Sequence, residues 1–292
     1  MVKGSGGLLS QTKKQLRSLE LHARKGLGQH FLVDEKVLER IVSAAELDSM
    51  DTVVEAGPGL GILTKALAQR AGRVIAVELD PRLASALEQA LASLANVTIV
   101  NADILESDPV ELIKEARGAV EPRYKVVANL PYYIASAVVR HFLEAGLKPR
   151  LMVFMVQKEV AQAIVAQPGD MSLLSVSAQL YGKPSIVDYV PPRSFYPPPK
   201  VSSAIVRIEV YDHPAVEEDV TRFFEVVRAG FTAPRKQLHN SLAQGLKILP
   251  AEAAALLEKA RISQERRAET LTLEEWAQLC RVFSAAALKE QC

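Results

Sequence analysis

Short apolar segments alternate with amphipathic ones between residues 52 and 156, and this alternation constrains the fold more than any other feature. Strands separated by helices are typical of a parallel sheet that is covered on both faces and joined by right-handed crossovers. The sequence therefore predicts an α/β fold with a Rossmann-like sheet. Strands are predicted at 52–56, 73–78, 97–100, 125–128 and 151–156, with helices at 62–70 and 81–94.

The pattern changes toward the C-terminus. Two β-rich segments, 185–189 and 202–210, have no helix between them, so we expect them to pair antiparallel at one edge of the sheet. The proline-rich linker 191–199 joins them and should hold its backbone extended and stiff. Only helices are predicted beyond residue 211. We expect three parts: a flexible basic extension at 1–24, a catalytic domain at 25–211 and a small all-helical domain at 212–292.

Composition excludes several classes of protein. Apolar residues make up 49% and charged residues 24%, which is ordinary for a globular protein. The longest strongly apolar stretch, 151–156, is far shorter than the about 20 residues of a membrane span, so we expect no membrane association. The two cysteines, Cys280 and Cys292, provide neither a disulfide framework nor a zinc cluster. We therefore expect a cytoplasmic protein without a metal.

Basic residues gather at two places, although the formal net charge is only +1. The segment before Phe31 carries six lysines and arginines against a single acid, Glu20, and a second cluster lies at Arg235 and Lys236. Local patches of this kind can hold phosphates even when the whole protein is nearly neutral.

A glycine-rich turn follows the first predicted strand, with the sequence EAGPGLG at 55–61. Such a turn, here with Gly57 and Gly59, lets the backbone approach a nucleotide-like ligand at a helix N-terminus. NAD enzymes have a similar turn. Glu55 before the glycines and Pro58 between them favour S-adenosylmethionine, since a nucleoside joined to an amino acid has no pyrophosphate to cradle.

Two acidic residues follow successive strands. Glu78 ends the second strand, where a carboxylate can accept hydrogen bonds from both ribose hydroxyls, as it also would for NAD. Asp103 follows the third strand, where it can accept from the adenine amino group of the cofactor. Either acid alone could be a helix cap. Together they indicate a ligand at the carboxyl ends of the strands.

The fourth predicted strand runs directly into Asn129-Leu130-Pro131-Tyr132. The amino group of adenine is a poor nucleophile because its lone pair is delocalised into the ring. The Asn129 side-chain oxygen and the Leu130 carbonyl could each accept one of its hydrogens, which would favour a tetrahedral nitrogen. Pro131 stiffens the carbonyl, and Tyr132 can stack on the base. Such catalysis depends on positioning and aimed dipoles, and the target base must first leave its helix or loop.

From about residue 25 to the C-terminal helices, the chain resembles the KsgA family of bacterial small-subunit ribosomal RNA adenine dimethyltransferases. The motifs that carry the resemblance are KGLGQHFL at 25–32, the Asn129–Tyr132 tetrapeptide, FYPPPKV at 195–201 and FTAPRKQLHNSL at 231–242. His30 stands where the family often has asparagine, and Pro234 departs slightly from the family's basic run.

The resemblance implies a role for individual residues. The aromatic ring of Phe195 is expected to sandwich the flipped adenine against Tyr132. Phosphate contacts are expected from Lys25 in the N-terminal basic segment, and from Arg235 and Lys236. Cofactor contacts are implied at His30, Leu32, Gly57, Glu78, Asp103 and Asn129.

The resemblance also implies a substrate: two adjacent adenines in a hairpin loop near the 3′ end of small-subunit (16S) ribosomal RNA, each dimethylated at N6. The implied partner is the immature 30S subunit, and we expect a monomer. Three alternatives stay open: an Erm-type methyltransferase of large-subunit (23S) RNA, a catalytically silent RNA-binding assembly factor, and an NAD-dependent dehydrogenase. The residues alone support only an amino-group methyltransferase that acts on a base.

Overall fold

The computed structural model describes residues 7–18, 30–114 and 124–290. The chain forms two compact units, Met1–Gln162 with Lys183–Val210, and Ala163–Gly182 with Tyr211–Cys292. Residues 163–182 thus belong with the C-terminal helices, whereas the sequence analysis placed them in the catalytic domain. Helix α8 (Leu173–Tyr181) in this segment packs on α12 (Leu273–Glu290), which is why the unit takes it up.

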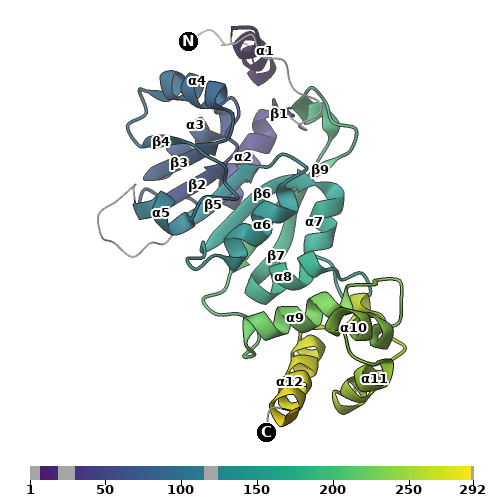
Figure 1. Cartoon of the computed structure of the whole chain (residues 1–292). Helices are drawn as coiled ribbons and strands as arrows, with labels where there is room; N and C mark the ends of the chain where they lie inside the picture. Colours follow the sequence, from purple (N-terminus) through teal and green to yellow (C-terminus); the bar gives the residue numbers. More distant parts are fainter. Residues whose placement is uncertain (1–6, 19–29, 115–123, 291–292) are drawn as a thin grey trace. The chain divides into compact units, whose positions relative to one another are not determined.

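A seven-stranded sheet forms the centre of the first unit in the described part of the chain, in the order β4-β3-β2-β5-β6-β9-β7 (Figure 1). Neighbouring strands from β4 to β6 are parallel, and β9 is antiparallel to β6. This confirms the predicted α/β sheet; the direction of β7 against β9 stays a prediction. The strands are β2 (Thr52–Ala56), β3 (Arg73–Glu78), β4 (Val97–Asn101), β5 (Tyr124–Asn129), β6 (Leu151–Gln157), β7 (Gly182–Val190) and β9 (Ser203–Val210).

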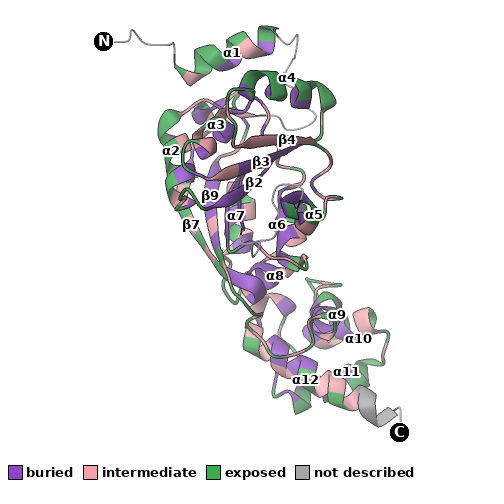
Figure 2. Ribbon diagram, turned by 90° about the vertical axis from the view of Figure 1, so that its left-hand side faces the viewer, coloured by how far each residue is buried: buried purple, intermediate pink, exposed green. Residues whose placement is uncertain are grey.

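Helices cover both faces of this sheet, so residues of β2 are buried along its whole length. Figure 2 shows α2 and α3 on one face and α5 and α6 on the other. Asp34 caps the start of α2 by accepting hydrogen bonds from two backbone amides. The helices are α2 (Glu35–Ala44), α3 (Ile62–Ala68), α4 (Pro81–Leu91), α5 (Pro109–Lys114), α6 (Ala135–Glu144) and α7 (Lys158–Ile164).

A second, two-stranded sheet joins the N-terminal motif to the proline-rich segment. In this sheet β1 (Phe31–Leu32) pairs antiparallel with β8 (Phe195–Tyr196), which follows the short 3-10 helix η2 (Pro192–Ser194). The hydroxyl of Ser194 donates to Asp34 Oδ2 at 2.8 Å, and Val33 N donates to Ser194 O at 2.9 Å. Two segments about 160 positions apart are thereby fixed together.

Helix α1 (Leu8–Ser18) occupies part of the N-terminal segment that the sequence analysis expected to be flexible. Thr12 and Leu16, four positions apart, are buried on one side of α1, while its basic side chains are exposed. Packing of that face accounts for the helix, since 11 residues of this composition are marginal alone.

The second unit is built from helices in its described residues, as the sequence predicts. Trp276 lies at its centre with no exposed surface, and its ring centroid is 5.7 Å from that of Phe231. None of the helices in the described part of the chain is both long and apolar enough to cross a membrane. Besides α8 and α12, the unit contains α9 (Val220–Gly230), α10 (Leu238–Leu246), α11 (Pro250–Lys259) and the 3-10 helix η3 (Ala268–Thr270).

Candidate active site at the carboxyl ends of the strands

A cavity of about 650 Å³ lies in the first unit, where β2, β3, β4 and β5 end. Ligands of open α/β sheets bind at this edge. Each residue that the sequence analysis proposed for cofactor binding or catalysis lines the cavity: His30, Leu32, Gly57, Gly59, Glu78, Asp103, Asn129, Leu130, Pro131, Tyr132 and Phe195. The structure thus brings together residues from six separate segments, while leaving their individual roles as proposals.

The glycine-rich turn forms one wall. Gly57 has a φ of +69° and donates its backbone amide to Val77 O at 2.9 Å, which ties the turn to β3. Gly59 has a φ of +58°, and a Cβ there would lie 3.3 Å from the Phe31 ring. Both positions favour glycine, because other residues rarely adopt a left-handed conformation. The turn therefore offers bare backbone to a ligand.

Glu78 is held firmly at the end of β3. Its two carboxylate oxygens accept hydrogen bonds from Gly59 N at 3.2 Å and from Asp80 N at 3.0 Å. Burial raises the pKa of Glu78, and these backbone amides oppose the rise. Each carboxylate oxygen has a second lone pair, so Glu78 can still accept from a diol in the cavity.

Asp103 lies beyond the end of β4, on the next loop of the same edge. One of its carboxylate oxygens accepts a hydrogen bond from Leu105 N at 2.9 Å, and this bond fixes the Asp103 side chain to the backbone of its own loop. Asn101 braces the neighbouring loop by donating to Glu78 O at 2.8 Å. Glu78 and Asp103 are thus fixed on adjacent strand ends, and both line the cavity.

Glu55, before the glycine turn, is almost fully buried and also lines the cavity. Burial raises the pKa of Glu55 to about 8; the adjacent Thr64 hydroxyl lowers it and the charge of Glu78 adds to the rise. Its Oε2 atom makes no hydrogen bond with a described residue. At neutral pH the side chain is therefore mainly a neutral acid with an unused polar atom beside the cavity.

Asn129 is the last residue of β5, and the NH2 group of its side-chain amide already forms a hydrogen bond. Its Nδ2 atom donates to the backbone carbonyl of His30 at 3.3 Å. His30 in turn donates from Nδ1 to Pro197 O at 2.7 Å, since a carbonyl can only accept. These contacts orient the amide so that Oδ1 is left as an acceptor.

The peptide after Asn129 is fixed on both sides. Leu130 N donates to Met155 O on β6 at 3.1 Å, and the carbonyl of Pro131 accepts from Ile134 N at 3.2 Å. Pro131 also fixes its own φ. The Leu130 carbonyl is therefore held between two anchored peptides at the cavity wall.

Tyr132 is anchored at both ends of its side chain. Its hydroxyl lies 2.8 Å from Ser203 Oγ, and its ring centroid is 5.4 Å from that of His30 with a tilt of 34°. Burial raises the pKa of Tyr132, Ser203 opposes this, and the charge of Glu159 adds to it. The phenol therefore stays neutral and the ring has a set direction.

Phe195 is more enclosed than the expected base-stacking role requires. Its side chain is only 3% exposed and belongs to the apolar core cluster that includes Leu32 and Val190. The residue nevertheless lines the cavity. Phe195 thus presents part of its ring as a wall, while most of the ring is packed.

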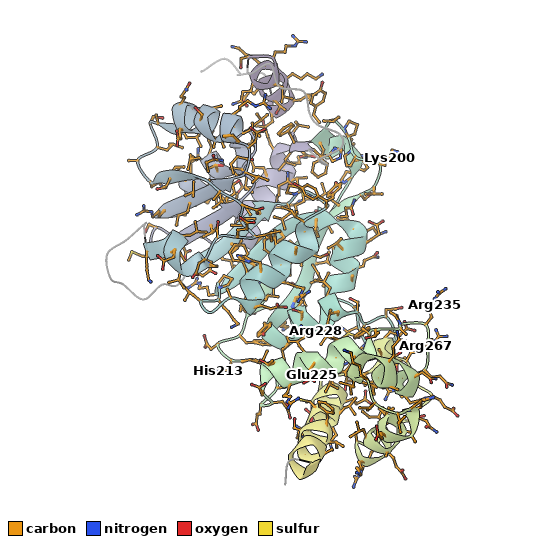
Figure 3. All side chains as sticks on the ribbon, viewed as in Figure 1. Lys200, His213, Glu225, Arg228, Arg235 and Arg267 are labelled. Atoms are coloured by element: carbon orange, nitrogen blue, oxygen red, sulfur yellow. The ribbon has the colours of Figure 1, made fainter. Side chains whose placement is uncertain are left out.

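The proposed RNA-binding residues lie elsewhere. Arg235 and Lys236 belong to the second unit and are exposed, just before α10. Figure 3 shows Arg235 and Arg267 extending from the same side of this unit. Lys25 lies outside the described residues. No cluster of three or more His, Cys, Asp or Glu side chains that could hold a metal occurs within the described ranges.

Sequence reasoning missed the residues that hold the site. Ser203 carries no local signal, because its partner Tyr132 is 71 positions away. Asp34 could have been recognised as a helix cap, since it directly precedes the periodic apolar pattern of α2. Its further bond to Ser194 could not, because that contact depends on the tertiary fold.

The sheet order, the glycine turn and the strand-end acids define a class I S-adenosylmethionine-dependent methyltransferase. The model of the family described as "Ribosomal RNA adenine dimethylase" matches residues 20–284. The chain belongs to this family.

Individual relatives agree with this assignment. A "Ribosomal RNA small subunit methyltransferase A" of Dehalococcoides mccartyi is 51% identical over 283 residues, which cover 96% of this chain and 95% of that protein. The crystal structure of a dimethyladenosine transferase from Plasmodium falciparum is similar with a TM-score of 0.71, 25% identity, and coverage of 88% of this chain and 98% of that one. The crystal structure of the 23S rRNA methyltransferase ErmE gives a TM-score of 0.67 and 32% identity, with coverage of 87% and 99%.

Proposed function

We propose that this chain transfers methyl groups from S-adenosylmethionine to N6 of two adjacent adenines in the 3′-terminal hairpin loop of small-subunit ribosomal RNA, giving dimethyladenosines. The observation that carries the proposal is the position of Asn129. Its amide is oriented by His30 at a strand end, in the same cavity as Glu78 and Asp103.

The cavity fits the cofactor by the chemistry of its lining. Glu78 would accept from the ribose hydroxyls, and Asp103, with a second carboxylate oxygen available, would accept from the adenine amino group. The bare backbone at Gly57 and Gly59 would lie against the ligand, and Glu55 offers an unpartnered buried oxygen on the same wall. S-adenosylmethionine, when bound, supplies an electrophilic methyl group.

Asn129 and Leu130 act on the nucleophile. The Oδ1 atom of Asn129 accepts one hydrogen of the substrate amine, and the Leu130 carbonyl accepts the other. The two acceptors would favour a tetrahedral nitrogen whose lone pair takes the methyl group as the bond from that methyl to the cofactor sulfur breaks, and the proton displaced from the nitrogen would pass to water. Because both acceptors are already fixed by other hydrogen bonds, little reorganisation accompanies the reaction. In the second transfer a single hydrogen remains, and Asn129 is the acceptor that we assign to it.

Tyr132 and Phe195 hold the flipped base. The Tyr132 ring, fixed by Ser203 and His30, provides a stacking face. Phe195, packed in the core, provides a rigid wall and not a mobile clamp. Stacking in this manner selects an unpaired base, since paired bases in double-stranded RNA are inaccessible.

The second unit supplies contacts to phosphate. Arg235 and Lys236 are exposed, and neither forms an ion pair in the described part of the chain. Arg266, by contrast, is committed to Glu275 and Thr270. We assign the phosphate contacts to Arg235 and Lys236, with Lys25 as a further one, and take the partner to be the immature 30S subunit, bound by a monomer in the cytoplasm.

The relatives favour a small-subunit over a large-subunit substrate. Identity to the small-subunit methyltransferase of D. mccartyi is 51%, against 32% to ErmE. A catalytically silent assembly factor is less consistent with the chain, because the whole acceptor arrangement around Asn129 is in place.

The direct test of the substrate is a competition between unmodified small and large ribosomal subunits for a labelled methyl group. We expect the label in the small-subunit RNA. Label in large-subunit RNA would indicate an Erm-type methyltransferase. Cofactor binding without methyl transfer to either subunit would indicate a catalytically silent RNA-binding assembly factor.

A further inference from the structure

Tyr133 is an exposed aromatic side chain at the mouth of the cavity. It is 62% exposed and yet lines the cavity, directly after Tyr132 in the chain. Among the exposed large apolar side chains in the described part of the chain, only Leu79 shares this position, and it follows Glu78 on the proposed cofactor side. Single exposed apolar residues are common on protein surfaces. The place of Tyr133, beside the ring assigned to the target base, is what calls for an explanation.

The side chain of Tyr133 makes no hydrogen bond, ring contact or cation–π contact with a described residue. Most of the other tyrosines do make a contact with an aromatic ring or with a lysine within the described ranges: Tyr124, Tyr132, Tyr181, Tyr189 and Tyr196. Both faces of an unpartnered ring can accept another flat group. Tyr133 is therefore open to a ligand that reaches the mouth of the cavity.

The backbone that carries this ring is fixed. Ile134 N donates to Pro131 O at 3.2 Å, which closes the turn that contains Tyr132 and Tyr133. Val138 N donates to Ile134 O at 2.9 Å and begins α6 directly after the turn. A tyrosine side chain has only two torsions to order, so it offers a large contact area at a low cost in conformational entropy. The ring thus has a set origin and a solvent-exposed surface.

The base next to the target in the RNA strand reaches the same place. Consecutive Cα atoms are only about 3.8 Å apart, so Tyr133 begins close to the residue that we assign to the target base. A base that enters the cavity stays joined to its neighbour through one phosphodiester, which keeps the neighbouring base near the mouth. Every base has a face that can stack on an aromatic side chain, and such stacking strengthens the binding of unpaired bases.

We propose that Tyr133 stacks on the base that flanks the target adenine. The proposal rests on the function proposed above, in which two adjacent adenines are methylated. When one adenine occupies the cavity, the other lies on Tyr133. Because the RNA strand runs through the site in one direction, Tyr133 receives the neighbour on one side of the target only. The ring therefore treats the two adenines differently, since the second of them, as the target, places another base on Tyr133.

The test combines a change in the protein with a change in the RNA. Initial rates of methyl transfer give kcat/KM for unmodified small subunits that carry both adenines, or uridine at either of the two positions. Tyr133→Ala should lower kcat/KM by about fivefold or more on subunits with both adenines. With uridine at one of the two positions, Tyr133 meets a smaller ring, and the loss should shrink to about twofold or less. Any effect of uridine on the RNA itself cancels, because it is common to both proteins.

Two further variants make the result specific. Tyr133→Phe keeps the ring and should restore the dependence on the neighbouring base. Tyr189→Ala is the matched control, since Tyr189 is another exposed tyrosine of the same unit and does not line the cavity. This control should have the kcat/KM of the unaltered chain on all three kinds of subunit. Equilibrium binding of S-adenosylhomocysteine should be unchanged in Tyr133→Ala, which would show a folded protein with an intact cofactor side.

Two outcomes would overturn the proposal. An equal loss on all three kinds of subunit would mean that Tyr133 acts on the target base or on the fold. An unchanged kcat/KM of Tyr133→Ala on subunits with both adenines would mean that the ring contacts no part of the RNA. Failure of the proposed function is distinguishable, because the unaltered chain would then transfer no methyl group to small subunits, and both proposals would be wrong.

Discussion

The side-chain amide of Asn129 donates a hydrogen bond to the backbone carbonyl of His30, 3.3 Å away and 99 positions earlier in the sequence. The bond commits Nδ2 and leaves Oδ1 as the acceptor in the cavity. An asparagine without such a partner could present either end of its amide to the substrate. The N-terminal motif therefore contributes to the chemistry of the Asn129–Tyr132 segment.

Replacement of Asn129 by alanine should lower the rate constant of methyl transfer by about 10²–10³-fold, the usual effect of removing one aimed polar group. RNA affinity should change little, because Asn129 lies in the cavity and not among the exposed basic residues. Single-turnover transfer and filter binding on the same preparation separate the two quantities. A parallel loss of RNA binding would contradict the assigned role.

The hydroxyl of Tyr132 should matter less than its ring. Tyr132→Phe removes only the 2.8 Å contact with Ser203, so kcat/KM should fall less than tenfold, as for a single neutral hydrogen bond of about 1 kcal/mol. Tyr132→Ala also removes the stacking face, which is worth about 1–3 kcal/mol per base.

Ser203→Ala provides the matched control for this pair. It should reproduce the effect of Tyr132→Phe, since either change breaks the same bond. If Tyr132→Phe and Tyr132→Ala had equal effects on kcat/KM, the ring would have no role in holding the base.

The stability of the first unit should fall as the pH rises, because of Glu55. The pKa of Glu55 is raised to about 8 in the folded chain, from the ordinary glutamate value of 4.5 that applies to the unfolded chain. Between these values the unfolded chain ionises while the folded chain keeps its proton, so the free energy of unfolding decreases with pH and levels off above pH 8. Each pKa unit corresponds to about 1.4 kcal/mol.

Glu55→Gln removes this titration while it keeps the shape of the side chain. Its free energy of unfolding relative to the unaltered chain should therefore rise from about pH 6 to about pH 9 in urea titrations. An unchanged difference between the two proteins over that range would show that Glu55 is already charged in the folded state.

The double change Arg235→Glu with Lys236→Glu should weaken binding to small subunits and leave cofactor affinity unchanged. If the two side chains contact one phosphate each, the slope of log affinity against log salt should become shallower by about 1–2. The control is Lys247→Glu with Lys259→Glu, two positions of the same unit outside this cluster. Equal weakening in the control would mean that total charge and not this patch determines binding.

The sequence predicts the strands of the parallel sheet well, because each is a short apolar run between turn signals. The predicted segment 73–78 coincides with β3, and 151–156 falls one residue short of β6. The motifs also predicted the family, and the family match confirms it. Gly57, Glu78, Asp103 and Asn129 were predicted together because strand ends share one edge of a parallel sheet, whereas His30, Leu32 and Phe195 were expected only from the family resemblance.

The contacts that orient the site were not predictable in the same way. The bond between Tyr132 and Ser203 and the bond between Asp34 and Ser194 join segments 71 and 160 positions apart, and neither leaves a local pattern. The segment that contains α1 was expected to be flexible, because a short basic segment is marginal as an isolated helix. In the structure, Leu16 of α1 packs against Leu60 and Leu83 on the cavity wall. The burial of Phe195 likewise depends on its neighbours in the folded core.

The most direct test of the central claim is nucleoside analysis by mass spectrometry of RNA from unmodified small subunits after incubation with S-adenosylmethionine and the chain. We predict N6,N6-dimethyladenosine at two adjacent adenines of the 3′-terminal hairpin with the unaltered chain, and about 10²–10³-fold slower formation with Asn129→Ala at equal subunit binding. Dimethyladenosine formed equally well by Asn129→Ala, or methylation on an atom other than the adenine amino nitrogen, would contradict the account.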